Sequence, residues 1–159
     1  MKIKVLLILL TAGLFLLTSC SNTGDQTAVS DPLTGIEIAE KLQASGDFTE
    51  LTSASDKVFE KYLMIETTDL EDHLLLTDAT RETAELIVLV KVRRMEEAEA
   101  VRQKLDDYLA EQKALYRDYQ PGEMTKLDQA VVEVSNRWIS LLVSKDPNAS
   151  RKLLHEMIK

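Results

Sequence analysis

The sequence contains a single cysteine, Cys20, so no disulfide bond can form within the chain. An odd cysteine in an exported protein calls for another use of its thiol. Cys20 directly follows an apolar stretch, Val5 to Leu17, and Lys2 and Lys4 are the only charged residues before position 25. About 13 apolar residues are too few to cross a bilayer, because a transmembrane helix needs roughly 20. The pattern therefore predicts a cleaved signal peptide.

The residues at the end of this stretch, Leu17-Thr18-Ser19-Cys20, resemble a bacterial lipobox. In a lipobox the cysteine thiol receives a lipid, and the chain is cut just before it, here between Ser19 and Cys20. The chain is then divided into a lipoprotein signal peptide (residues 1–19), a lipidated Cys20 with a flexible tether (residues 20–34) and a globular domain (residues 35–159). Because two acyl chains anchor a protein stably, we expect an extracytoplasmic protein, lipid-anchored to the outer face of the cell membrane.

Basic residues are too few for a nucleic-acid partner. The chain has 27 acidic and 19 basic residues, and loss of Lys2 and Lys4 with the signal peptide gives a net charge of −10. Nucleic-acid binding depends on clustered basic side chains that neutralise phosphates. The local basic cluster, Lys91, Arg93 and Arg94, is either a contact for an anionic headgroup or wall polymer or a solvated strand end.

Motifs that carry chemistry are missing as well. The five glycines form neither a Gly-x-Ser-x-Gly turn nor a Gly-Lys-Ser/Thr phosphate loop. The two histidines, His73 and His155, have no partner at metal-ligand spacing, and the acidic stretch from Glu66 to Asp72 lacks the glycine and the bidentate glutamate of a calcium loop. We therefore predict no catalytic residue, no cofactor and no metal site.

Hydrophobic periodicity predicts four helices and four strands. The predicted helices span residues 36–45, 55–64 and 95–119, with a fourth that begins at Asp146-Pro147; the predicted strands span residues 74–77, 86–92, 131–135 and 138–144. Thr34-x-x-Glu37 is a capping box for the first helix, and Asn136 suits a tight turn between the last two strands. The order ααββαββα predicts a single α+β domain, with an antiparallel four-stranded sheet packed on helices.

Four aromatic residues in the second half of the predicted domain are considered in two groups. Tyr108, Tyr116 and Tyr119 follow the apolar stripe of the long helix and are predicted to pack in the core. Trp138 lies on the face of its strand opposite Ile139 and the apolar residues that alternate with it. That position has two interpretations, since Trp138 is either a candidate contact surface for a partner or a side chain covered by a helix.

Four blocks of the sequence resemble one family. They are YLMIETTDLEDHLLL, TAELIVLVKV, EAEAVRQKLDDYLAEQKALYRDYQP and AVVEVSNRWISLLVSKDP. From Phe59 to Leu154 the chain is similar to uncharacterised lipoproteins of Gram-positive, clostridial-type bacteria, the domain of unknown function 4358. The most characteristic features are Glu85, which opens an apolar strand, the long helix that ends at Tyr119-Gln120-Pro121, and the last hairpin, which ends in Ser144-Lys145-Asp146. Family members often have a Gly-Asn-aromatic turn in the last hairpin, where this chain has Ser135-Asn136-Arg137-Trp138. The resemblance implies a lipoprotein with a single domain and carries over no catalytic residue.

Two functions follow from these observations. The first is a non-enzymatic binding or accessory module of the cell envelope, held on the membrane by the lipid on Cys20, with an envelope protein or wall ligand as its partner. The alternative is a hydrolase or other enzyme that acts on envelope polymers, which only the compartment suggests.

Overall fold

The computed structural model describes residues 33–158. The predicted signal peptide, the lipobox with Cys20 and the tether as far as residue 32 lie outside the described residues, so these assignments stay predictions. Among the helices of the described part, none is long and apolar enough to span a membrane.

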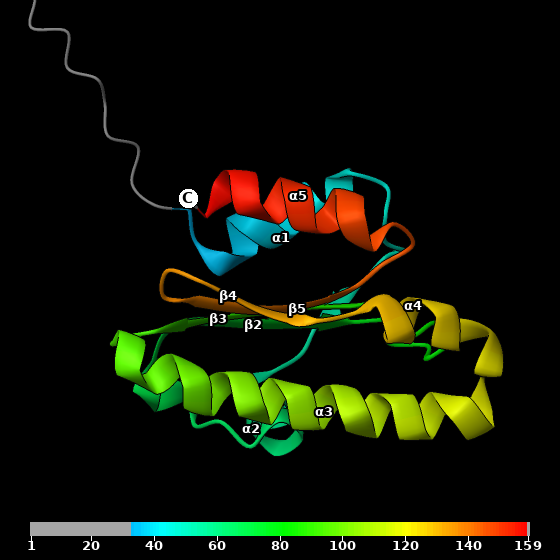
Figure 1. Cartoon of the computed structure of the whole chain (residues 1–159), viewed down its shortest axis with the longest axis horizontal. Coiled ribbons are helices and arrows are strands. Elements are labelled where there is room, and N and C mark those ends of the chain that lie inside the picture. Colours follow the sequence, from blue (N-terminus) through cyan, green and yellow to red (C-terminus); the bar gives the residue numbers. More distant parts are fainter. Residues whose placement is uncertain (1–32, 159) are drawn as a thin grey trace, which may run out of the picture. The chain divides into compact units, whose positions relative to one another are not determined.

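The domain is built on a five-stranded antiparallel sheet with the strand order β1-β2-β3-β5-β4. The strands are β1 (Thr52–Ser53), β2 (Leu70–Thr77), β3 (Leu86–Val92), β4 (Val132–Ser135) and β5 (Trp138–Val143). The helices are α1 (Gly35–Ala44), α2 (Asp56–Leu63), α3 (Ala98–Tyr119), α4 (Met124–Gln129) and α5 (Pro147–Met157). Helices α1 and α5 cover one face of the sheet, and α2 and α3 cover the other (Figure 1).

The central strand β3 divides the apolar interior into two cores. Val88 and Val90 point to the α2/α3 side, where they pack with residues such as Leu105. Ile87 and Leu89 point to the α1/α5 side. A strand covered on both faces reads as a continuous apolar run rather than an alternating one. This confirms the prediction of a buried central strand at residues 86–92.

The predicted local signals form as expected. Thr34 and Glu37 make the reciprocal capping box of α1. The Asp146 carboxylate accepts hydrogen bonds from the first backbone N–H groups of α5, and Pro147 occupies the first turn. Asn136 takes a left-handed φ of 53° in the β4–β5 turn, and its side-chain amide donates to the Ile158 carbonyl at 2.9 Å. These signals need only neighbouring residues, which is why the sequence reveals them.

The prediction of four strands in the order ααββαββα is wrong in two places. The fifth strand, β1, consists of two exposed polar residues that pair with Thr77 and Leu76 at the end of β2, and two residues are too few to show a period. The additional helix α4 has six residues. Strand β2 also begins earlier than predicted, at Leu70, because its polar first half pairs with β3.

The apolar stripe of α3 is buried for only part of its length. Leu105 has no exposed surface, whereas Leu115 is 52% exposed and Tyr119 is 66% exposed. The prediction that Tyr119 packs in the core is therefore wrong, because near the end of α3 only one side of the helix is covered: Tyr116 lies on the covered side and Tyr119 does not. Tyr108 and Tyr116 are buried as predicted.

The two leucines of α3 give a matched test of this difference. Replacing Leu105 with alanine is expected to lower the free energy of unfolding by about 2–5 kcal/mol, because the truncation leaves a cavity in a packed core. Replacing Leu115 with alanine should change it by about 0.5 kcal/mol or less. Urea denaturation followed by circular dichroism measures both. Equal losses in the two variants would show that the end of α3 is packed as tightly as its middle.

Candidate functional site

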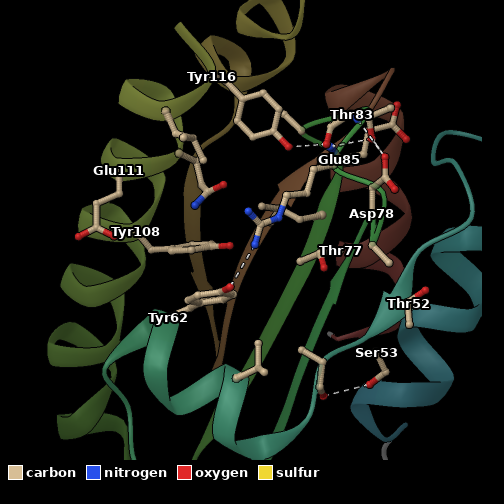
Figure 2. A pocket seen from close by; sticks show the side chains of 18 residues that line it. Thr52, Ser53, Tyr62, Thr77, Asp78, Thr83, Glu85, Tyr108, Glu111 and Tyr116 are labelled. Carbon is tan, nitrogen blue, oxygen red and sulfur yellow. Dashed lines mark hydrogen bonds between the residues drawn. The ribbon is translucent and has the colours of Figure 1, made fainter. Parts of the chain in front are cut away.

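A cavity of about 520 Å³ lies on the α2/α3 side of the sheet, beside the loop that joins β2 to β3 (Figure 2). Its walls come from β1, α2, the β2–β3 loop and α3. Small-molecule sites usually have volumes of about 300–1,000 Å³. The cavity therefore has the size of a ligand site and combines segments that are distant in the sequence.

Three tyrosines line the cavity: Tyr62 from α2, and Tyr108 and Tyr116 from α3. The Tyr116 hydroxyl donates a 2.6 Å hydrogen bond to the Thr83 carbonyl, which ties the β2–β3 loop to α3. Burial raises the pKa of Tyr116 and raises the pKa of Tyr108 still further. Both phenols therefore stay neutral at physiological pH, where they can donate and accept hydrogen bonds.

Tyr108 is the most distinctive of the three. Only 6% of the residue is exposed. Figure 2 shows its hydroxyl pointing into the cavity, toward the same region as the Tyr62 hydroxyl. Among the residues that the structure describes, none forms a hydrogen bond with it. The hydroxyl oxygen is not among the fully buried, unpaired side-chain atoms of the described residues, so it is accessible from the cavity, where water or a ligand can form a hydrogen bond with it.

The cavity also has apolar walls. Val58, Tyr62 and Leu115 are exposed by 36%, 39% and 52%, and all three line it. In the described part of the chain, these large side chains share one hollow instead of being scattered over the surface. An apolar surface gathered in a concave site is characteristic of a binding site.

The loop between β2 and β3 is held by Asp78. The Asp78 carboxylate accepts hydrogen bonds from the side chain and backbone of Thr80 and from the side chain and backbone of Thr83. These bonds, that from the Thr80 hydroxyl above all, outweigh burial and lower the pKa of Asp78. Arg81 takes a left-handed φ of 59° in this loop, and its guanidinium donates to the Tyr62 hydroxyl at 3.4 Å. The loop thus presents a cation at the cavity on a fixed backbone.

A buried ion network lies behind the cavity. Glu85, 1% exposed, accepts a 2.8 Å hydrogen bond from the Lys126 ammonium and a 2.5 Å bond from the Thr49 backbone N–H. Lys126 also donates to Glu123 at 2.9 Å, and Glu123 accepts a bond from the Ala84 backbone N–H. We call Glu85, Lys126 and Glu123 the Glu85 network. It joins β3 to α4 and to the segment before β1.

The charges of this network are maintained by its hydrogen bonds. Burial on its own would raise the pKa of Glu85, but the donors from Lys126 and Thr49 outweigh it, and the pKa is lowered. Burial would likewise lower the pKa of Lys126, but its two carboxylate partners raise it. Glu85 is therefore ionised and fully engaged by protein donors, which suits a structural role better than that of a proton donor.

Trp138, the candidate contact surface, is 5% exposed and packs in the core between the sheet and helices α1 and α5. Its contact-surface interpretation is therefore corrected, because the two helices close that face of the sheet. The Lys91 ammonium lies 5.5 Å from the centre of its ring. The interpretation that a helix covers Trp138 agrees with the structure.

The two histidines lie apart and have structural neighbours. His73 lies 3.2 Å from the Asp56 carboxylate, and its ring meets that of Phe59 edge-on. His155 lies 3.2 Å from the Glu133 carboxylate. Within residues 33–158, no cluster of three or more His, Cys, Asp or Glu side chains is placed to hold a metal ion.

Residues of the acidic stretch from Glu66 to Asp72 and of the basic cluster at residues 91–94 form ion pairs and hydrogen bonds with other groups of the domain. Glu71 pairs with Lys91 at 2.7 Å and also with Arg137, and Arg94 pairs with Glu97. Asp72 accepts a 2.6 Å hydrogen bond from the Gly35 backbone N–H at the start of α1. Two of the three residues in the basic cluster are thus paired with carboxylates, which favours a solvated strand end over a headgroup contact.

The sequence does not predict the cavity as a site. Its pattern places Tyr108 in the core, and Arg81 lies in a polar stretch between two strands. The available signal was weak: Val58 and Tyr62 are four residues apart and so share one face of a helix. The sequence shows that Glu85 is an acidic residue at the start of an apolar strand. It does not show that Lys126 is the partner of Glu85.

Comparison with known families gives one match. The model for a domain of unknown function (DUF4358) matches residues 44–144. That segment includes all residues that line the cavity and all three members of the Glu85 network. No curated protein and no solved structure matches the chain.

Proposed function

The chain belongs to the DUF4358 family, and on that premise we propose that it is a membrane-anchored extracytoplasmic lipoprotein whose domain is a non-enzymatic binding module of the cell envelope. The cavity is the observation that supports a binding function. It is formed by packed elements of the fold, and it exposes apolar walls together with the Tyr108 hydroxyl. The lipobox at Leu17-Thr18-Ser19-Cys20 supports the location.

The chemistry of the cavity favours binding over hydrolysis. Hydrolysis of a glycosidic bond typically needs two carboxyl groups that flank the bond, one of which acts as an acid. Three carboxylates line the cavity: Asp78, Glu85 and Glu111. Asp78 and Glu85 accept several hydrogen bonds each and have lowered pKa values. Lowered pKa values oppose a role as general acid at neutral pH, so only Glu111 is left for such work.

The binding function is tested by adding the soluble fragments of a digested cell wall to the full chain in detergent. A bound fragment should raise the thermal midpoint of unfolding, because a ligand that binds only the folded state stabilises it. Leu115→Trp fills part of the cavity and should abolish the rise. Tyr119→Trp, on the same helix but outside the cavity, should keep it.

A thermal midpoint that no wall fraction raises would count against the proposed binding function. So would a rise that is equal in the wild type and in Leu115→Trp, because the ligand would then bind elsewhere. Both variants change exposed positions, so their circular dichroism spectra should match that of the wild type.

A further inference from the structure

We propose that the ligand of the cavity is a neutral sugar residue, with Tyr62 and Tyr108 as its aromatic contacts and Arg81 as a polar contact. This inference rests on the proposed binding function and names the class of ligand. It follows from three properties of the cavity: the mixture of its charges, its combination of apolar and hydroxyl surface, and the accessible Tyr108 hydroxyl, which has no hydrogen-bond partner within residues 33–158.

The charges around the cavity favour a neutral ligand. Asp78 and Arg81 face it from the β2–β3 loop, and Glu111 faces it from α3; Glu85 also lines it and is paired with Lys126. An anionic ligand would meet Asp78 and Glu111, and a cationic ligand would meet Arg81. A neutral hydroxyl group can bind next to charged side chains of either sign, because it donates a hydrogen bond to a carboxylate and accepts one from a guanidinium.

The surface of the cavity matches a ring with apolar faces and polar edges. A pyranose has C–H groups on its faces and hydroxyl groups around its rim. Val58, Leu115 and the tyrosine rings offer apolar surface to such faces. Gln112, which also lines the cavity, carries an amide that both donates and accepts. Aromatic rings combined with planar polar side chains are therefore complementary to a sugar.

A purely apolar ligand fits the cavity less well. A lipid chain would exclude water from the Tyr108 hydroxyl without supplying a hydrogen bond. A buried polar group left without a partner costs more than a formed hydrogen bond contributes. The volume of about 520 Å³ lies within the range of small-ligand sites and accommodates a ring with substituents.

The test is saturation-transfer-difference NMR on the full chain in a polyoxyethylene detergent, which contains no sugar. The probes are N,N′,N″-triacetylchitotriose and cellotriose, which are neutral, and trigalacturonate, which is anionic. We expect saturation on the ring C–H protons of a neutral probe. Titrations should show weaker binding by about fivefold in Tyr108→Phe, because one neutral hydrogen bond is lost. Arg81→Gln should also weaken binding, and the matched control Tyr119→Phe should bind as the wild type does.

The sugar assignment is overturned if neither neutral probe binds, if only trigalacturonate binds, or if Tyr108→Phe binds as tightly as the wild type. These failures differ from failure of the binding function. If the digested wall raises the thermal midpoint through the cavity while the neutral probes do not bind, the cavity has a ligand of another class. Tyr108→Phe keeps the aromatic ring, so an unchanged melting curve confirms that a loss of binding is local.

Discussion

Replacing Lys126 with methionine should lower the free energy of unfolding by about 3–5 kcal/mol, because it leaves the charge of a buried carboxylate without its partner. Glu85 has a fully buried side chain, and the Lys126 ammonium is the one cation that pairs with it in the described part of the chain. Methionine retains most of the aliphatic stem of lysine, so the loss reports on charge more than on packing. Urea denaturation at pH 7 measures it.

The matched control is Lys113→Met. Lys113 lies 3.8 Å from Asp128, which is 64% exposed, and an exposed ion pair contributes about 0–1 kcal/mol. The double variant Lys126→Met with Glu85→Gln should recover part of the stability, because it removes the uncompensated charge. If Lys126→Met and Lys113→Met cost the same, the Glu85 network does not stabilise the fold.

The stability lost in Lys126→Met should depend on pH, and the pKa shifts of Glu85 and Lys126 give the direction. The pKa of Glu85 is lowered in the folded protein, so its contribution is present above the pKa of the unfolded chain and is lost as the pH falls through the folded value. The pKa of Lys126 is raised, so its contribution is present below the unfolded pKa and is lost as the pH rises through the folded value. The difference between the wild type and Lys126→Met should therefore shrink in acid.

Replacing Cys20 with alanine is expected to abolish lipid attachment completely. Only a thiol can form the thioether that carries the diacyl group, and each buried methylene contributes about 0.8 kcal/mol to membrane binding. Mass spectrometry of the wild-type protein from the membrane fraction should show residues 1–19 removed and a diacylglyceryl group on Cys20. The alanine variant should show no lipid and no cut before residue 20.

Ser21→Ala is the control, since it changes the residue after the cysteine and keeps the thiol; it should be lipidated as in the wild type. An intact N-terminal methionine and an unmodified thiol in the wild-type protein would contradict the predicted anchor, as would its recovery from the cytosol. This test addresses location and is independent of whether the cavity binds a ligand.

Much of the fold could be predicted because its signals are local. The run of apolar residues at 86–92 identified the central strand, and the predicted boundaries of that strand agree with β3. Two signals at helix ends, the Thr34 capping box and the Asp146 cap, are confirmed. Each of these signals is contained within a few residues, where periodicity and hydrogen-bond chemistry are sufficient.

The errors arose where a residue's environment depends on distant segments. Leu115 and Tyr119 continue the period of α3, but nothing in the helix itself shows which of its last residues the neighbouring elements cover. The sequence leaves two interpretations for Trp138, because only the packing of helices α1 and α5 closes its face of the sheet. Strand β1 exists only because the end of β2 offers a partner to two polar residues.

The candidate site depends on tertiary structure almost entirely. Tyr62, Arg81 and Tyr108 lie on α2, a loop and α3, and Glu85 is 41 residues from Lys126. The order of residues along the chain specifies periods and caps and predicts a lipobox, because these act between neighbours. It does not specify which side chains enclose a volume, because a cavity and a buried ion pair exist only once separate elements have packed.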